Sequence, residues 1–175
     1  GAWFLCTYAM LAFVGFCNLL PAPSDPWVEG YFSGGKHSRI QALSSVIHAL
    51  GALAMGLLFD RRGARWCLLV SQLCAVLQHS IRAATSSAWQ LYLSRLPLAL
   101  SHSCLVLKAL LLQECSPDGR AHVLAHANLA QHLGAFLGGV MGHHFTYELH
   151  DGFLGAQLAT FGSLLGFASA LLAAG

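Results

Sequence analysis

The stretch GLLFDRRGAR, residues 56–65, decides how the rest of the sequence is interpreted. Its four charged residues are Asp60, Arg61, Arg62 and Arg65, in a chain of 175 residues with only nine basic and seven acidic side chains. Long apolar segments lie on both sides of it. A short charged connection between two such segments is typical of antiparallel helices that meet at a membrane surface. Gly63 supplies the backbone freedom that this sharp turn requires.

The composition is that of a chain whose main solvent is lipid. Hydrophobic residues make up 56% and charged residues 9%, against about 25% charged residues in soluble domains. The apolar residues form six runs, each near the roughly 20 residues that a helix needs to cross a bilayer. These runs are 3–20, 40–59, 66–84, 89–112, 123–142 and 153–174. Because backbone groups in lipid must be paired within their own segment, we expect an all-α membrane fold of six transmembrane helices in one domain, 1–175.

Several function classes find no support in the sequence. The net charge of +2 is small and scattered, which argues against a nucleic-acid partner. The six cysteines form no CxxC pair, and most lie inside apolar runs, as packing cysteines do. His143, His144, His150 and Asp151 resemble a metal site only loosely, so no metal is predicted. No nucleophile elbow, phosphate loop or HExxH pattern occurs, so we expect neither an enzyme nor a cofactor.

The basic residues indicate an orientation in the membrane. Arg61, Arg62, Arg65 and Arg120 lie near the second and fourth connections, whereas Lys36, Arg39 and Arg82 lie on the opposite side. The positive-inside rule therefore places the opening stretch and both ends of the chain in the cytoplasm. We expect a multi-pass protein of the plasma membrane or an organelle membrane. The start at Gly1 and the end in LLAAG indicate a fragment or a processed chain.

The charged stretch also predicts a latch at the cytoplasmic mouth of the helix bundle. A carboxylate at a helix end accepts hydrogen bonds from the N–H groups of a facing helix terminus. Gly56 lies one turn before Asp60 and allows a neighbouring helix to come close. Arg61 and Arg65 can pair with carboxylates or lipid head groups. The simpler alternative is a charged loop that only enforces topology.

This stretch resembles a known signature. Gly56, Leu58, Asp60, Arg61, Gly63 and Arg65 match the G-x-L-x-D-R-x-G-R-[RK] motif of major facilitator superfamily transporters, which joins their second and third helices. Ala64 departs from it, because the family usually has a basic residue there.

Two further stretches resemble the same superfamily. Arg95 in LYLSRLPLALSH resembles the fourth-helix R-x-x-x-G pattern, with Ala99 in place of the glycine. GAFLGGVMG, residues 134–142, resembles the fifth-helix motif of proton-coupled drug exporters, with Gly139 in place of its proline. These features are most similar to the drug:proton antiporter branch and to organic-cation-transporter-like carriers of solute carrier family 22.

The resemblance implies the amino-terminal six-helix half of a carrier that works by alternating access. Its partners would be the lipid bilayer, a small organic solute and a second six-helix half, from the same chain or another subunit. A cationic solute and proton coupling are the finer implications. The alternative is a six-helix structural subunit of a membrane complex that transports nothing.

Polar residues inside the apolar runs predict the solute or proton pathway, because an ionisable group in mid-membrane costs at least about 2.5 kcal/mol. The predicted residues are Arg95, His102, His132, His48 and Asn18. The three histidines would form a proton relay or a cation-sensing site, and the alternative for each is a hydrogen-bonded packing role. Lys108 is expected to extend to the cytoplasmic surface and pair with Glu114.

Glycines in the fifth run predict a helix-packing hinge. Gly134, Gly138 and Gly142 recur every four residues and share one face, with Gly139 beside them. A plain packing stripe is the alternative. The resemblance also implies that the first and fourth helices line a central cavity, the second and fifth flank it, and the third and sixth face lipid.

Overall fold

The computed structural model describes residues 2–19, 36–84, 88–145 and 154–174, and these contain helices and turns but no strand. This confirms the all-α prediction. The helices are α1 (Ala2–Leu19), α3 (Lys36–Arg62), α4 (Ala64–Ala83), α5 (Ala88–Ser94), η2 (Pro97–Leu100), α6 (Ser103–Gln113), η3 (Pro117–Gly119), α7 (Arg120–His143) and α8 (Leu154–Ala174). His150 and Asp151 of the histidine-rich connection lie outside the described residues.

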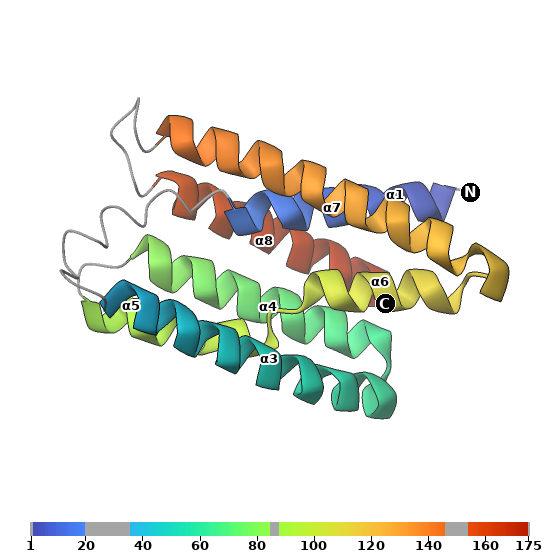
Figure 1. Cartoon of the computed structure of the whole chain (residues 1–175), viewed down its shortest axis with the longest axis horizontal. Coiled ribbons are helices and arrows are strands. Elements are labelled where there is room, and N and C mark those ends of the chain that lie inside the picture. The colour runs from blue at the N-terminus through green and yellow to red at the C-terminus, as the bar shows by residue number, and fades with distance from the viewer. Residues whose placement is uncertain (1, 20–35, 85–87, 146–153, 175) are drawn as a thin grey trace.

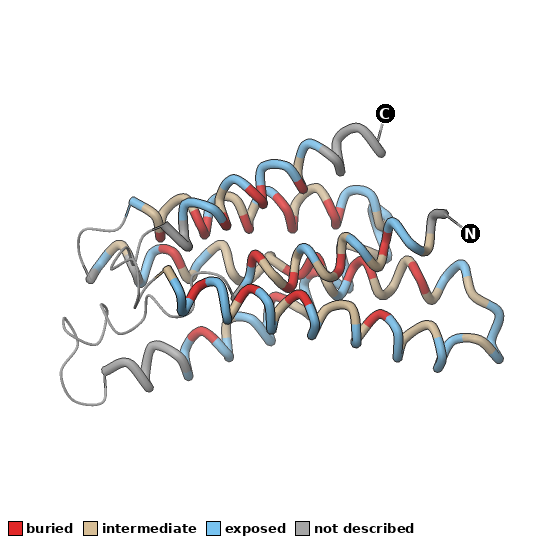
Figure 2. Tube along the Cα trace, turned by 90° about the horizontal axis from the view of Figure 1, so that it is seen from above, coloured by how far each residue is buried: buried red, intermediate tan, exposed pale blue. Residues whose placement is uncertain are grey.

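The long helices run side by side along the longest axis of the molecule (Figure 1). Three pairings dominate their packing: α1 with α7, α4 with α8, and α3 with η2. Buried positions face one another inside the bundle, and exposed positions lie mainly on its outside (Figure 2). A hydrophobic core forms where α1, α3, α4, α6 and α7 meet. Its buried members are Leu11, Met55, Cys67, Leu68, Val106, Leu107, Leu111 and Ala127.

Glycines on both partners bring α1 and α7 together. A Cβ at Gly134 would overlap the Ala12 carbonyl, and one at Gly138 would overlap the Phe16 carbonyl. A Cβ at Gly15 would overlap the Gln131 carbonyl in the same way. Gly134, Gly138 and Gly142 are all buried, whereas a Cβ at Gly139 would meet nothing within 4 Å. The glycine stripe is therefore a packing surface, and its role as a hinge stays a prediction.

The turn between α3 and α4 depends on one glycine. Gly63 has φ 80° and ψ 172°, a region open almost only to glycine, and its N–H donates to the Phe59 carbonyl at 2.9 Å. Gly56 behaves differently from the expectation, because a Cβ there would meet no atom of the described chain within 4 Å. Within this structure, Gly56 is not a point of close helix approach.

The fourth apolar run, expected as one continuous helix, is broken into α5, η2 and α6. Pro97 has no N–H to give to the Leu93 carbonyl, and the N–H of Leu96 takes that acceptor at 3.1 Å. Ser101, at φ −83° and ψ 69°, ends the 3₁₀ segment, and His102, at φ −113° and ψ 35°, precedes α6. The break therefore falls at His102, near the middle of the run.

By length and hydropathy, two described helical stretches are suited to cross a membrane, Ala42–Arg62 and Tyr92–Gln113. Phe4–Asn18 and Gln157–Ala168 are shorter apolar stretches. Polar residues such as Gln72, Gln78 and His79 reduce the hydropathy of α4. The count of six spans stays a prediction.

Candidate solute cavity

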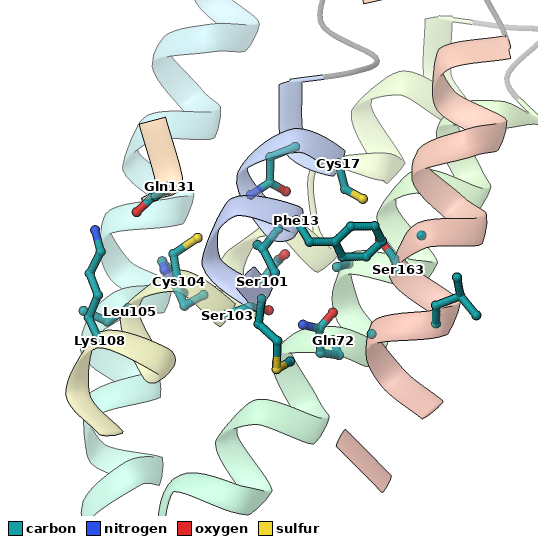
Figure 3. A pocket seen from close by; sticks show the side chains of 18 of the residues that line it. Phe13, Cys17, Gln72, Ser101, Ser103, Cys104, Leu105, Lys108, Gln131 and Ser163 are labelled. Carbon is teal, nitrogen blue, oxygen red and sulfur yellow. The ribbon is translucent and has the colours of Figure 1, made fainter. Parts of the chain in front are cut away.

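A cavity of about 610 Å³ lies between the helices near the middle of their length. Its walls come from α1, α3, α4, α6, α7, α8 and the break before α6, and Figure 3 shows Gln72, Ser101, Ser103 and Ser163 around this space. The volume is in the range of sites for small organic ligands, about 300–1,000 Å³. Apolar side chains, including Met10, Phe13 and Val14 of α1, line another part of the wall.

Several polar groups that line the cavity have no hydrogen-bond partner. They are Nε2 of Gln72, Nε2 of His102 and Oε1 of Gln131. Gln72 is 3% exposed and His102 is 6% exposed. An unsatisfied buried polar atom costs about 1–3 kcal/mol, so these three atoms are a local energetic cost in the wall of the cavity.

Two histidines predicted as pathway residues meet in this cavity. The rings of His48 on α3 and His102 have their centroids 4.1 Å apart. Asn18 also lines the cavity. His132, expected in the same relay, is exposed and is not among the lining residues. The structure thus brings together two of the three histidines and places the third elsewhere on α7.

Arg95 lies between α5 and η2, outside the cavity lining, and its Nε is buried without a partner.

His79 on α4 is a further buried histidine, not among the predicted pathway residues. It is 1% exposed and has no partner for either ring nitrogen. His79 does not line the cavity either. No group of three or more His, Cys, Asp or Glu in the described part of the chain is placed to hold a metal ion.

The third and sixth helices are not purely outer helices in this structure, contrary to the expectation. Gln72 on α4 and Ser163 on α8 line the cavity, because these two helices pack against each other beside it. A hydrogen bond of 2.9 Å between the hydroxyl groups of Ser71 and Ser103 joins α4 to the first residue of α6. This bond holds the broken helix against the cavity wall.

Lys108 also departs from its expected position. It is half-buried and lines the cavity with Cys104, one turn before it on α6 (Figure 3), while Glu114 is exposed. No residue that lines the cavity in the described structure is acidic. The signal that would have found this feature is the distribution of charge along the chain, because every acidic residue lies outside the six apolar runs.

The charged latch motif lies at the bundle end, away from the cavity. Asp60, Arg61, Arg62 and Arg65 are all exposed around the turn at Gly63. Their exposure leaves these charges accessible to a facing surface or to lipid head groups.

The described residues form an all-helical bundle with a cavity, and comparison with known proteins gives its class, that of membrane transporters. The sequence profile of the sugar (and other) transporter family matches residues 10–172. Human solute carrier family 67 member A1 is 32% identical to the chain over 108 residues, which is 59% of this chain and 26% of that relative. The chain therefore belongs to the sugar (and other) transporter family, within the major facilitator superfamily. The aligned part spans about a quarter of the curated relative.

Proposed function

We propose that this chain forms one half of a carrier that moves a small organic solute across a membrane by alternating access. The observation that carries the proposal is the cavity at mid-length with three unpartnered polar atoms around it. Carrier sites lie near the bilayer midplane and are commonly built at interrupted helices. The interruption before α6 supplies Ser101, His102 and Ser103 to this cavity.

Six membrane spans, a second six-helix half and a latch that closes against it complete the proposal. Alternating access requires two bundles that rock about a shared site. The exposed charges of Asp60, Arg61 and Arg65 suit contact with such a partner. Proton coupling is proposed from the resemblance of the motifs at residues 56–65, 95 and 134–142 to the drug:proton antiporter branch.

The access mechanism is tested with Ser163→Cys as the sole cysteine of the complete natural protein. Ser163 is buried and lines the cavity, so a membrane-impermeant maleimide reaches position 163 only through the cavity. We expect labelling from each side of the membrane in sealed vesicles of both orientations. The matched control is Ser116→Cys in the exposed α6–α7 connection, which should react from one side only. Labelling of position 163 from a single side contradicts alternating access and favours the structural-subunit alternative.

Proton coupling is assigned to the His48–His102 pair, since imidazole changes charge near neutral pH and the rings are in contact. The ratio of labelling from one side of the membrane to labelling from the other, at position 163, should then change between about pH 5 and 8. His102→Ala should remove that change, and His122→Ala, at an exposed position of α7, should leave it intact. An unchanged pH profile in the His102 variant removes the pair from the mechanism.

A further inference from the structure

The walls of the cavity carry information about the charge of the solute. Among the described residues that line it, Lys108 has a formal positive charge and none has a negative one. The whole sequence shows the same bias. Arg82, Arg95 and Lys108 lie within the six apolar runs, whereas all seven acidic residues lie outside them. A cation in this cavity would meet a like charge and no carboxylate from this half.

The start of α6 adds backbone donors to the same wall. α6 has 11 residues, and His102, which precedes it, makes no side-chain capping hydrogen bond. The first intrahelical bond runs from the N–H of Val106 to the His102 carbonyl at 3.1 Å, so the N–H groups of residues 103–105 precede it. Ser103, Cys104 and Leu105 all line the cavity. Such a terminus favours a negative group, because its N–H groups and the helix dipole are both directed toward it.

Two buried side chains reinforce this preference independently. Gln72 and His102 both line the cavity, each is more than nine-tenths buried, and each has a buried side-chain nitrogen without a hydrogen-bond partner. The Gln72 amide nitrogen can only donate a hydrogen bond, and the His102 Nε2 donates in one tautomer or when protonated. Gln72 on α4 and His102, the residue before α6, therefore bring potential donors to the wall of a cavity that Lys108 also lines.

The remaining wall selects for an organic body. Met10, Phe13, Val14 and Leu165 give the cavity apolar surface beside its polar groups. A small inorganic anion would leave that surface in contact with water and fill little of about 610 Å³.

From this placement we propose that the solute is a small organic anion, a carboxylate with an apolar body. The carboxylate lies at the first turn of α6 and the amide of Gln72, in a cavity that Lys108 also lines, and its apolar part lies against Phe13 and Val14 of α1. This assignment rests on the proposed transport function, because it concerns the same cavity. It differs from the cationic solute that the resemblance to organic-cation carriers implies.

The test compares probes that share a skeleton and differ in charge: benzoate, benzyl alcohol and benzylammonium, with inorganic phosphate as a fourth probe. Binding to the complete natural protein in detergent is measured from the rise in its unfolding temperature with probe concentration. We expect benzoate to bind most tightly. Equal or absent binding of the three organic probes, tighter binding of benzylammonium, or phosphate binding as tight as benzoate overturns the proposal.

Variants of Lys108 link this preference to the site. Lys108→Met should weaken benzoate at least about tenfold, because it removes the positive charge of the cavity lining, and Lys108→Arg should retain most of the affinity. Arg120→Gln, which removes an exposed positive charge outside the cavity, should have no effect. Equal losses in Lys108→Met and Arg120→Gln contradict the assignment. If Ser163→Cys is labelled from both sides of the membrane but benzoate does not bind preferentially, the transport proposal is supported and only the anionic solute is rejected.

Discussion

Gly63 shows how much a single residue contributes to the latch end of the bundle. Its φ of 80° and ψ of 172° are accessible almost only to glycine, yet an added Cβ would meet no atom within 4 Å. Gly63→Ala should therefore cost about 1–3 kcal/mol through backbone strain alone. Gly56→Ala is the matched control: its site is equally open and helical, so alanine should be neutral or stabilising by up to about 1 kcal/mol. Thermal unfolding in detergent measures both, and equal effects would refute the assigned strain.

Features set by the local sequence, such as turns, could be predicted. The residues that line the cavity depend on how each helix is rotated about its axis, and these could be predicted only in part. The turn at Gly63 was predictable because the connection between the two apolar runs is only a few residues long and contains one glycine. His48 and His102 were found because ionisable groups are rare in apolar runs. Gln72 and Ser163 were missed, because uncharged polar residues are common in such runs. Which side of an almost uniformly apolar helix faces a cavity is decided by its neighbours.

At the scale of the element, the α1–α7 contact rests on glycines that replace side chains at the crossing. Gly138→Ala should destabilise the bundle by about 1–3 kcal/mol, because the new Cβ would overlap the Phe16 carbonyl and force the helices apart. Gly139→Ala, one position along the same helix, points into open space and should be neutral or slightly stabilising. Unfolding temperatures of the two variants provide the measurement. Equal stability in both would contradict the close packing of α1 on α7.

The elements themselves followed closely from the apolar runs, except for the fourth. Its run of 24 residues, 89–112, reads as a continuous span, yet Pro97 in its interior removes one hydrogen bond of the helix. The proline made a disruption foreseeable. The position of the break at His102 was not foreseeable, because it depends on contacts between helices. The chain continues for one 3₁₀ segment before α6 starts, and the Ser71 hydroxyl forms a 2.9 Å hydrogen bond with the hydroxyl of Ser103, the first residue of α6. Because of this break, residues 101–105 line the cavity.

At the scale of the whole molecule, the bundle has two polar regions with different surroundings. The cavity lies between helices of this chain and is partly open, whereas the charges of residues 60–65 are exposed around Gly63. The exposure of this second region is what we expect of a surface that binds another protein segment. Sequence resemblance predicted the latch, and only the packing of α4 and α8 revealed the extent of the cavity.

This separation leads to a prediction for Asp60. Because Asp60 is exposed, Asp60→Asn should leave the unfolding temperature of the complete natural protein and its abundance in the membrane nearly unchanged. It should nevertheless alter the balance of labelling at Ser163→Cys between the two sides, since one conformation loses the hydrogen bonds of a charged acceptor, worth about 1.5–3 kcal/mol. That energy corresponds to a shift of tenfold or more in the equilibrium. Arg62→Gln, also exposed and outside the predicted latch residues, controls for the loss of a nearby charge. If Asp60→Asn and Arg62→Gln shift the labelling equally, or neither does, Asp60 is not part of a latch and the cluster acts only on membrane topology.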